Sequence, residues 1–201
     1  LAFDGIYTGF MGSAAQLERT ADFIRAFQSP GCPVIIDPVM GDHGKPYRTY
    51  TTEMCQKMEK LTTLADIITP NRTEAAILLG VGYAALRLDS EPESCRWAER
   101  LSANGIRSVV LKGVSLRPGR IGAVCFDRET GCTGFVDAPQ MPGQFHGTGD
   151  LFASVLTGAL VRKWSLIDAA RLAAEFTSLC AKAQGTPCRE GLDFEPQLWQ
   201  L

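Results

Sequence analysis

The amino-acid sequence predicts an α/β fold, a three-layer α/β/α sandwich with a mostly parallel central sheet. Short, continuously apolar segments alternate with amphipathic ones along the chain, which is typical of parallel strands that are buried on both faces. The 201 residues are enough for one domain with a substantial core. Apolar residues make up 45% of the chain and charged residues 21%, which is ordinary globular usage.

The first half of the chain predicts three strands and three helices in alternation. Ser13 with Gln16, and Asn71 with Glu74, have the spacing of capping boxes that open two of these helices. Strands are expected at residues 3–8, 33–37 and 66–69. Helices are expected at residues 13–28, 54–61 and 71–79.

The second half predicts another strand, a hairpin and three helices. One helix begins at Ser90, with Glu93 in its first turn, and the last helix begins at Ser165, with Asp168 in the same place. Strands are expected at residues 108–111, 121–126 and 133–136, the last two as a hairpin. Helices are expected from 90 to about 104–105, from 149 to about 163 and from 165 to about 183.

Charge and cysteine usage narrow the class of protein. A net charge of −2 gives no general attraction to nucleic acid or to an anionic membrane, and no apolar run is long enough to span a bilayer. Seven cysteines without a C-x-x-C pair, and only two histidines, argue against a zinc site. Reduced thiols in a cytoplasmic protein fit best, and a redox or nucleophilic cysteine is the alternative.

The most informative motif is Gly147-Thr148-Gly149-Asp150, which is followed at once by a helical pattern. The glycines let backbone N–H groups turn toward a ligand, and the helix adds unpaired N–H groups and the positive end of its dipole. An aspartate in such an anion site makes sense if it takes a proton from a hydroxyl that attacks a phosphoryl group. The alternative is a glycine turn with an acidic first helical turn, which the dipole alone favours.

Further polar residues follow the predicted strands: Asp37, Asp42, Thr69, Asn71, Glu74 and Lys112. Ligands bind beyond the carboxyl ends of strands in this class of fold. Each residue has a structural alternative, such as a turn or a capping box. Together, three carboxylates, a lysine and an anion site at one edge of a sheet suit Mg²⁺ and a nucleotide.

Three of these segments resemble the signatures of vitamin kinases in the ribokinase-like superfamily. They are residues 37–42, 66–75 and 147–150, and residues 6–13 resemble the same branch. The resemblance is closest to the pyridoxal/pyridoxamine kinases and runs in order through essentially the whole chain. It implies a single ribokinase-like kinase domain over residues 1–201 that lacks the family's N-terminal strand–helix–strand portion.

The resemblance also implies roles for individual residues. Asp150 would be the catalytic base, and Gly147, Thr148 and Gly149 would form the anion hole for the transferring phosphoryl group. Asn71 and Lys112 would contact the phosphates of ATP. Asp42 and Glu74 would hold Mg²⁺, with Asp37 close by. Thr69 and Asp37 would border a monovalent cation, unless Lys112 supplies that charge. Phe10 would lie on the substrate side beside Asp150, and residues 42–49 would form a lid.

The implied function is ATP-dependent phosphorylation of the 5′-hydroxymethyl group of a vitamin B6 vitamer. The implied partners are ATP, Mg²⁺, a small vitamin alcohol and a second copy of the chain in a homodimer. One alternative is a hydroxymethylpyrimidine kinase of thiamine synthesis, which shares two of the signatures. Another is a non-catalytic vitamer- or nucleotide-binding module, although such a module gains nothing from a carboxylate at the position of Asp150.

Overall fold

The computed structural model describes residues 2–103 and 108–201, and these residues confirm the α/β fold. A six-stranded sheet has the order β1-β2-β5-β6-β7-β8. The first four strands pair in parallel, whereas β7 pairs antiparallel with both of its neighbours, β6 and β8. The strands are β1 (Ile6–Thr8), β2 (Val34–Ile36), β5 (Ile67–Ile68), β6 (Ser108–Val114), β7 (Arg120–Asp127) and β8 (Thr133–Pro139).

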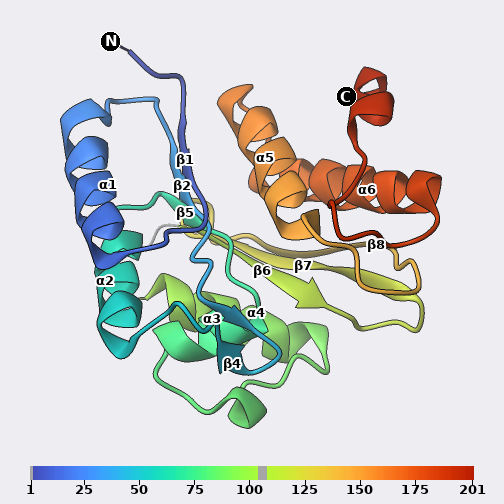
Figure 1. Cartoon of the computed structure of the whole chain (residues 1–201), viewed down its shortest axis with the longest axis horizontal. Coiled ribbons are helices and arrows are strands. Elements are labelled where there is room, and N and C mark those ends of the chain that lie inside the picture. Colours follow the sequence, from blue (N-terminus) through green and yellow to red (C-terminus); the bar gives the residue numbers. More distant parts are fainter. Residues whose placement is uncertain (1, 104–107) are drawn as a thin grey trace.

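Helices cover both faces of this sheet (Figure 1). Alternate residues of a strand point to opposite layers. Ile36 packs in the core beneath the first four helices, whereas its neighbour Ile35 packs against the last two. The first layer contains α1 (Ala14–Phe27), α2 (Thr52–Thr62), α3 (Arg72–Leu78) and α4 (Glu91–Ser102). The second contains α5 (Thr148–Val161) and α6 (Leu166–Gln184).

The predicted helix starts are confirmed by their caps. The Ser13 hydroxyl accepts a hydrogen bond from the Gln16 N–H at 3.2 Å, but the Gln16 side chain accepts from the Gly12 N–H at 2.6 Å rather than from Ser13. Asn71 and Glu74 form the complete reciprocal capping box. Asn71 therefore stands at a fixed point after β5, which matters because it borders the site described below.

The structure adds short elements that the sequence did not predict. In and beside the segment of residues 42–49, for which the resemblance implies a lid, β3 (Gly41–Asp42) and β4 (Lys45–Pro46) pair as a small antiparallel hairpin. Two short 3₁₀ segments, η1 (Tyr83–Ala85) and η2 (Glu195–Gln200), were also not predicted. The first strand is shorter than expected, and the expected end of α4 near residues 104–105 lies outside the described residues.

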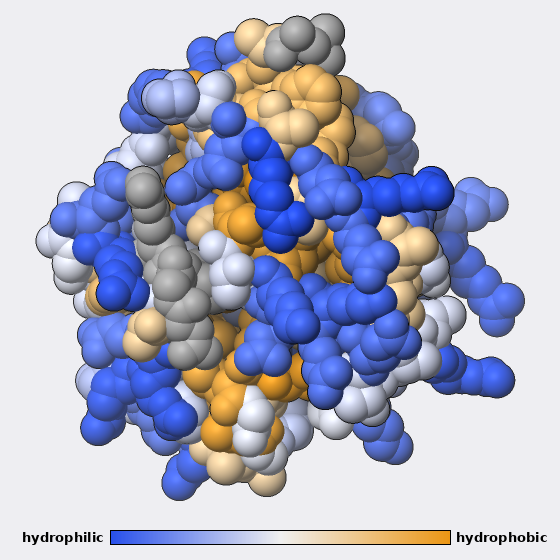
Figure 2. All heavy atoms as spheres, turned by 90° about the vertical axis from the view of Figure 1, so that its left-hand side faces the viewer, coloured by the Kyte–Doolittle hydropathy of each residue, from blue (hydrophilic) through white to orange (hydrophobic). Residues whose placement is uncertain are grey.

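The outer side of α1 and α2 carries mostly hydrophilic side chains, with apolar surface visible between them (Figure 2). This distribution is typical of amphipathic helices that pack one face on a sheet. In the part of the chain that the structure describes, no helix has the length and apolar character needed to cross a bilayer.

Candidate active site

A cleft of about 880 Å³ lies at the carboxyl ends of the parallel strands. This is where ligands bind in α/β folds with this sheet arrangement. It brings together nine predicted site residues from both halves of the chain: Asp37, Asp42, Asn71, Glu74, Lys112, Gly147, Thr148, Gly149 and Asp150. The sequence-based expectation that these residues meet at one edge of the sheet is therefore confirmed.

At the centre of the cleft, Asp37 and Lys112 form an ion pair. Asp37 directly follows β2, and Lys112 lies on β6, separated from it by β5. The Lys112 Nζ donates to both Asp37 carboxylate oxygens, at 2.8 and 2.9 Å. The Asp37 side chain is only 2% exposed. Burial raises the pKa of Asp37, and the Lys112 ammonium opposes that shift.

The N-terminus of α5 faces the same ammonium group. A methyl group built on Gly149 would lie 3.7 Å from the Lys112 Nζ. Gly147 caps the helix with φ of +80°, a left-handed conformation that favours glycine. Among the six α-helices of the described residues, α5 is the one whose N-cap makes no side-chain hydrogen bond. Its first N–H groups therefore remain available to an anion.

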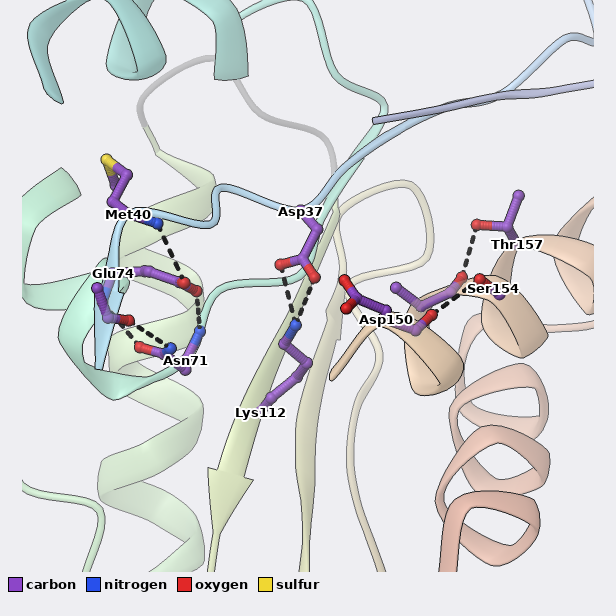
Figure 3. A network of polar contacts seen from close by, with 10 residues as sticks. Asp37, Met40, Asn71, Glu74, Lys112, Asp150, Ser154 and Thr157 are labelled. Carbon is purple, nitrogen blue, oxygen red and sulfur yellow. Dashed lines mark hydrogen bonds and ion pairs between the residues drawn. The ribbon is translucent and has the colours of Figure 1, made fainter. Parts of the chain in front are cut away.

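Asp150 projects from the first turn of α5 toward the Asp37–Lys112 pair (Figure 3). Its side chain is solvent-exposed, and its carboxylate makes no hydrogen bond or ion pair with the residues drawn there. This carboxylate lies beside unpaired N–H groups and an ammonium group. It can therefore accept a proton from a ligand hydroxyl.

On the other side of the pair, Asn71 and Glu74 tie the start of α3 to the hairpin. The Asn71 Nδ2 donates to the Gly41 carbonyl at 2.9 Å. Glu74 accepts from the Asn71 N–H at 2.7 Å and from the Met40 N–H at 3.4 Å. It is 2% exposed, and burial raises its pKa to about 8, with the nearby Asp37 charge adding to the shift. The structural role of Glu74 as a capping-box acid is therefore confirmed.

The three expected metal ligands do not form a preassembled cage. Within residues 2–103 and 108–201, no three His, Cys, Asp or Glu side chains gather closely enough to hold a metal ion. Asp37 is paired with Lys112, and the Asp42 carboxylate accepts from the His43 N–H at 2.8 Å. Mg²⁺ usually keeps several waters and is held by one or two carboxylates together with substrate phosphates. The oxygen donors in the cleft fit binding of that kind.

Two predicted residues are not among those that line the cleft. Thr69 is fully buried at the end of β5, next to the start of α3. Phe10 is 55% exposed, and its ring centroid lies 6.2 Å from that of Tyr50. The structure thus brings neither side chain to the cleft wall, and the expected substrate contact of Phe10 stays a prediction.

Sequence reasoning missed two tyrosines near the carboxylates. Tyr47 lines the cleft, and burial together with the charges of Asp42 and Glu74 raises its pKa. Tyr7 on β1 has a buried hydroxyl group, and burial and the charge of Asp37 raise its pKa. A tyrosine within a turn-rich segment after Asp42 was the available signal for Tyr47, whereas Tyr7 looked like an ordinary strand residue.

A second cavity of about 700 Å³ lies at the opposite, amino-terminal end of the strands. Pro33, Asp66 and Ser108 are among its lining residues. None of the predicted site residues lines this cavity.

Comparison with known proteins shows the family of the chain. The profile of the phosphomethylpyrimidine kinase family matches residues 1–192. The chain is 30% identical over 163 residues to a pyridoxal kinase of Arabidopsis thaliana, which covers 79% of this chain and 51% of that protein. The chain spans about half the length of the first curated relatives that it matches.

Two solved structures are similar over the whole chain. A Bacteroides thetaiotaomicron protein described as a phosphomethylpyrimidine kinase, determined with pyridoxal, has a TM-score of 0.90 and 34% identity. A pyridoxal kinase from Lactobacillus plantarum has a TM-score of 0.86 and 29% identity. Each comparison covers 100% of this chain and 71% of the other chain.

Proposed function

This chain belongs to the phosphomethylpyrimidine kinase family, and from that premise we propose that the protein transfers the γ-phosphate of ATP to the 5′-hydroxymethyl group of a vitamin B6 vitamer. The observation that carries the proposal is the position of Asp150. It stands uncommitted in the first turn of α5, beside a glycine-capped N-terminus and the Lys112 ammonium. These are the parts that transfer of a phosphoryl group to an alcohol requires.

In this proposal each part of the cleft acts on a different group. Asp150 accepts the proton of the vitamin hydroxyl as that oxygen attacks the γ-phosphorus of ATP, and the bond from this phosphorus to the β–γ bridging oxygen breaks, so that ADP leaves. The N–H groups of residues 147–149 stabilise the charge on the transferring phosphoryl oxygens. Asn71 and Lys112 contact the ATP phosphates, and Phe10 borders the vitamin.

Asp42 and Glu74 are the residues that would hold Mg²⁺, directly or through water. Mg²⁺ held there would neutralise negative charge on the phosphates of ATP. The exposed Asp42 carboxylate suits a direct contact. Glu74 suits a contact through water, because both of its oxygens already accept backbone hydrogen bonds.

The resemblance implies a monovalent cation beside Asp37 and Thr69. We propose that the Lys112 ammonium takes the place of this cation and supplies its positive charge. The ammonium contacts of 2.8 and 2.9 Å to Asp37 support this choice. We expect activity without added K⁺ or Na⁺, and a dependence on K⁺ to appear in Lys112→Ala. A wild-type protein that is inactive without K⁺ would contradict the proposal.

The main alternative to this proposal differs in the alcohol that accepts the phosphoryl group. Hydroxymethylpyrimidine kinase activity is the main alternative, since the family profile carries the phosphomethylpyrimidine name. The similarity to pyridoxal kinases, and to a relative determined with pyridoxal, favours vitamin B6. Turnover of pyridoxal, pyridoxine, pyridoxamine and hydroxymethylpyrimidine by the whole protein separates the two. Faster turnover of the pyrimidine would overturn our assignment.

The mechanism is tested by Asp150→Asn, which keeps the shape of the side chain and removes its charge. General-base assistance is worth about 10²–10⁴-fold in rate, so kcat should fall by roughly that factor. ATP affinity should stay the same or improve, because one negative charge beside the phosphates is lost. If the only role of Asp150 is a favourable interaction with the helix dipole, the substitution should instead lower the free energy of unfolding by about 0.3–1 kcal/mol. Near-normal turnover would favour that role, and no turnover by wild-type protein would favour a non-catalytic binding module.

We further propose a cytoplasmic location, which the seven free cysteines support, since cytoplasmic thiols are kept reduced. The homodimer implied by the resemblance stays a prediction.

A further inference from the structure

The β3–β4 hairpin carries Asp42 and leads to Tyr47, but it is too short to be stable alone. It consists of two pairs, Gly41 with Pro46 and Asp42 with Lys45, and isolated two-stranded hairpins are marginal at best even when they are longer. Its position over the cleft therefore depends on contacts with other elements.

The start of α3 holds the hairpin at two points. The Asn71 side chain donates to the Gly41 carbonyl at 2.9 Å. The Thr73 hydroxyl accepts from the Gly44 N–H at 2.9 Å. These two bonds fix the base and the turn of the hairpin against one helix end.

A third contact reaches the hairpin turn from η1. Gly44 has φ of +80°, and a methyl group built on it would lie 3.0–3.5 Å from three atoms of the Tyr83 ring. The ring thus packs directly on the glycine backbone. The Arg72 guanidinium carbon lies 4.2 Å from the centroid of the Tyr83 ring, within the range of a cation–π contact. The Arg72 Nη2 also donates to the Tyr83 carbonyl at 3.1 Å.

We propose that Tyr83, backed by Arg72, is a positioning residue of the kinase site: it holds the turn of the hairpin so that Asp42 and Tyr47 stay over the cleft. This inference rests on the proposed function for its effect on catalysis. Tyr83 itself lines the cleft, and the role assigned to it here is the contact of its ring with Gly44 rather than a part in the chemistry. It acts through Gly44 on the carboxylate that the proposed mechanism assigns to Mg²⁺.

The first test compares Tyr83→Ala with Tyr83→Phe in the whole protein. The alanine variant loses the ring, so the apparent KM for Mg·ATP should rise about 3- to 20-fold, as expected for loss of one cation–π contact. The value of kcat should change much less, because Asp150 and α5 are untouched. The phenylalanine variant keeps the ring and should behave as wild type. Equal KM values for all three proteins would overturn the proposal.

Amide hydrogen exchange of residues 41–50 tests the contact without any enzymatic assay. Tyr83→Ala and Arg72→Ala should each speed exchange in this segment. Arg100→Ala is the matched control, because Arg100 stacks on Trp97 at 4.4 Å in the other cation–π pair of the described residues, on α4. It should leave exchange of residues 41–50 unchanged. Unchanged exchange in Tyr83→Ala would refute the contact, whereas absence of ATP turnover in wild-type protein would refute the proposed function alone.

A double-mutant cycle gives a second, steric test. Gly44→Ala places a methyl group against the Tyr83 ring and adds the strain of a positive φ. In the Tyr83→Ala background the steric part is gone and only the strain remains. Gly44→Ala should therefore lower Tm less in that background than in wild type. Additive losses would contradict direct packing of the ring on Gly44.

Discussion

At the scale of single residues, the Asp37–Lys112 ion pair affects both the stability of the fold and the proposed binding of phosphate. A carboxylate that is 2% exposed depends on its partner, because a buried charge without compensation is costly. The same ammonium lies beside the N-terminus of α5, where an anion would bind. One lysine therefore both neutralises Asp37 and contributes to the proposed phosphate site.

We predict that Lys112→Met destabilises the fold by about 3–5 kcal/mol, since it leaves the buried Asp37 unpaired. Asp37→Asn in the same protein should recover much of that loss. Lys57→Met is the matched control, because Lys57 forms ion pairs with Glu18 and Glu53 at the surface. Surface pairs contribute little. Thermal unfolding of the four proteins checks this, and equal Tm values for Lys112→Met and Lys57→Met would contradict it.

Glu74 predicts a pH dependence of stability. Burial raises its pKa from 4.5 to about 8. Between these values the folded protein holds a proton that the unfolded chain has released, so this residue's contribution to stability falls as pH rises. Glu74→Gln keeps an acceptor for the capping box and does not titrate. The free energy of unfolding of wild type relative to Glu74→Gln should therefore decrease from pH 4.5 to 8. A constant difference would show that the raised pKa is wrong.

At the scale of elements, helix starts were predictable and the hairpin was not. Four helices begin at a residue whose side chain accepts a hydrogen bond from the N–H three positions further on, and this spacing can be recognised in the sequence. These residues are Ser13, Asn71, Ser90 and Ser165. The β3–β4 hairpin depends on Tyr83, which lies about forty residues further along the chain, and no local pattern contains that contact. The site was predictable where it follows strand ends, as with Asp37, and not where it depends on packing, as with Tyr47.

The glycine at the start of α5 carries a prediction of its own. Gly147 has φ of +80° and ψ of 0°, a left-handed conformation in which Ala should cost about 1–2 kcal/mol. Gly185 has φ of +75° and ψ of −47°, a rarer and more strained conformation in which Ala should cost at least as much. A methyl group meets nothing closer than 3.8 Å at Gly147 and nothing within 4 Å at Gly185, so strain alone sets the loss. Gly147→Ala should also lower kcat/KM at least about tenfold, because the N–H groups of the anion site are reoriented. Equal kcat/KM in both variants would argue against that site.

At the scale of the whole molecule, the cleft joins the two helical layers. One wall comes from α3 and the hairpin, and the other from α5 and α6, with the ends of β2 and β6 between them. A nucleotide that contacts both walls adds a bridge that the free protein lacks, and any ligand that binds only the folded state stabilises that state. Substitutions on either wall, although far apart in the sequence, should then each reduce the stabilisation that one ligand gives.

We therefore predict that Mg·ATP raises the Tm of the whole protein. At a concentration of 100 times Kd the stabilisation is about 2.7 kcal/mol, which corresponds to roughly 5–10 °C for a domain of this size. Asp42→Ala on the hairpin and Gly147→Ala on α5 should each reduce the increase, because each removes one side of the bridge. Asp150→Asn should keep it or enlarge it, since its proposed role is in chemistry. ATP with a chelator should stabilise less than Mg·ATP. If Asp42→Ala and Gly147→Ala both retain the full increase while Asp150→Asn loses it, nucleotide binding across the cleft is wrong and Asp150 is a binding residue.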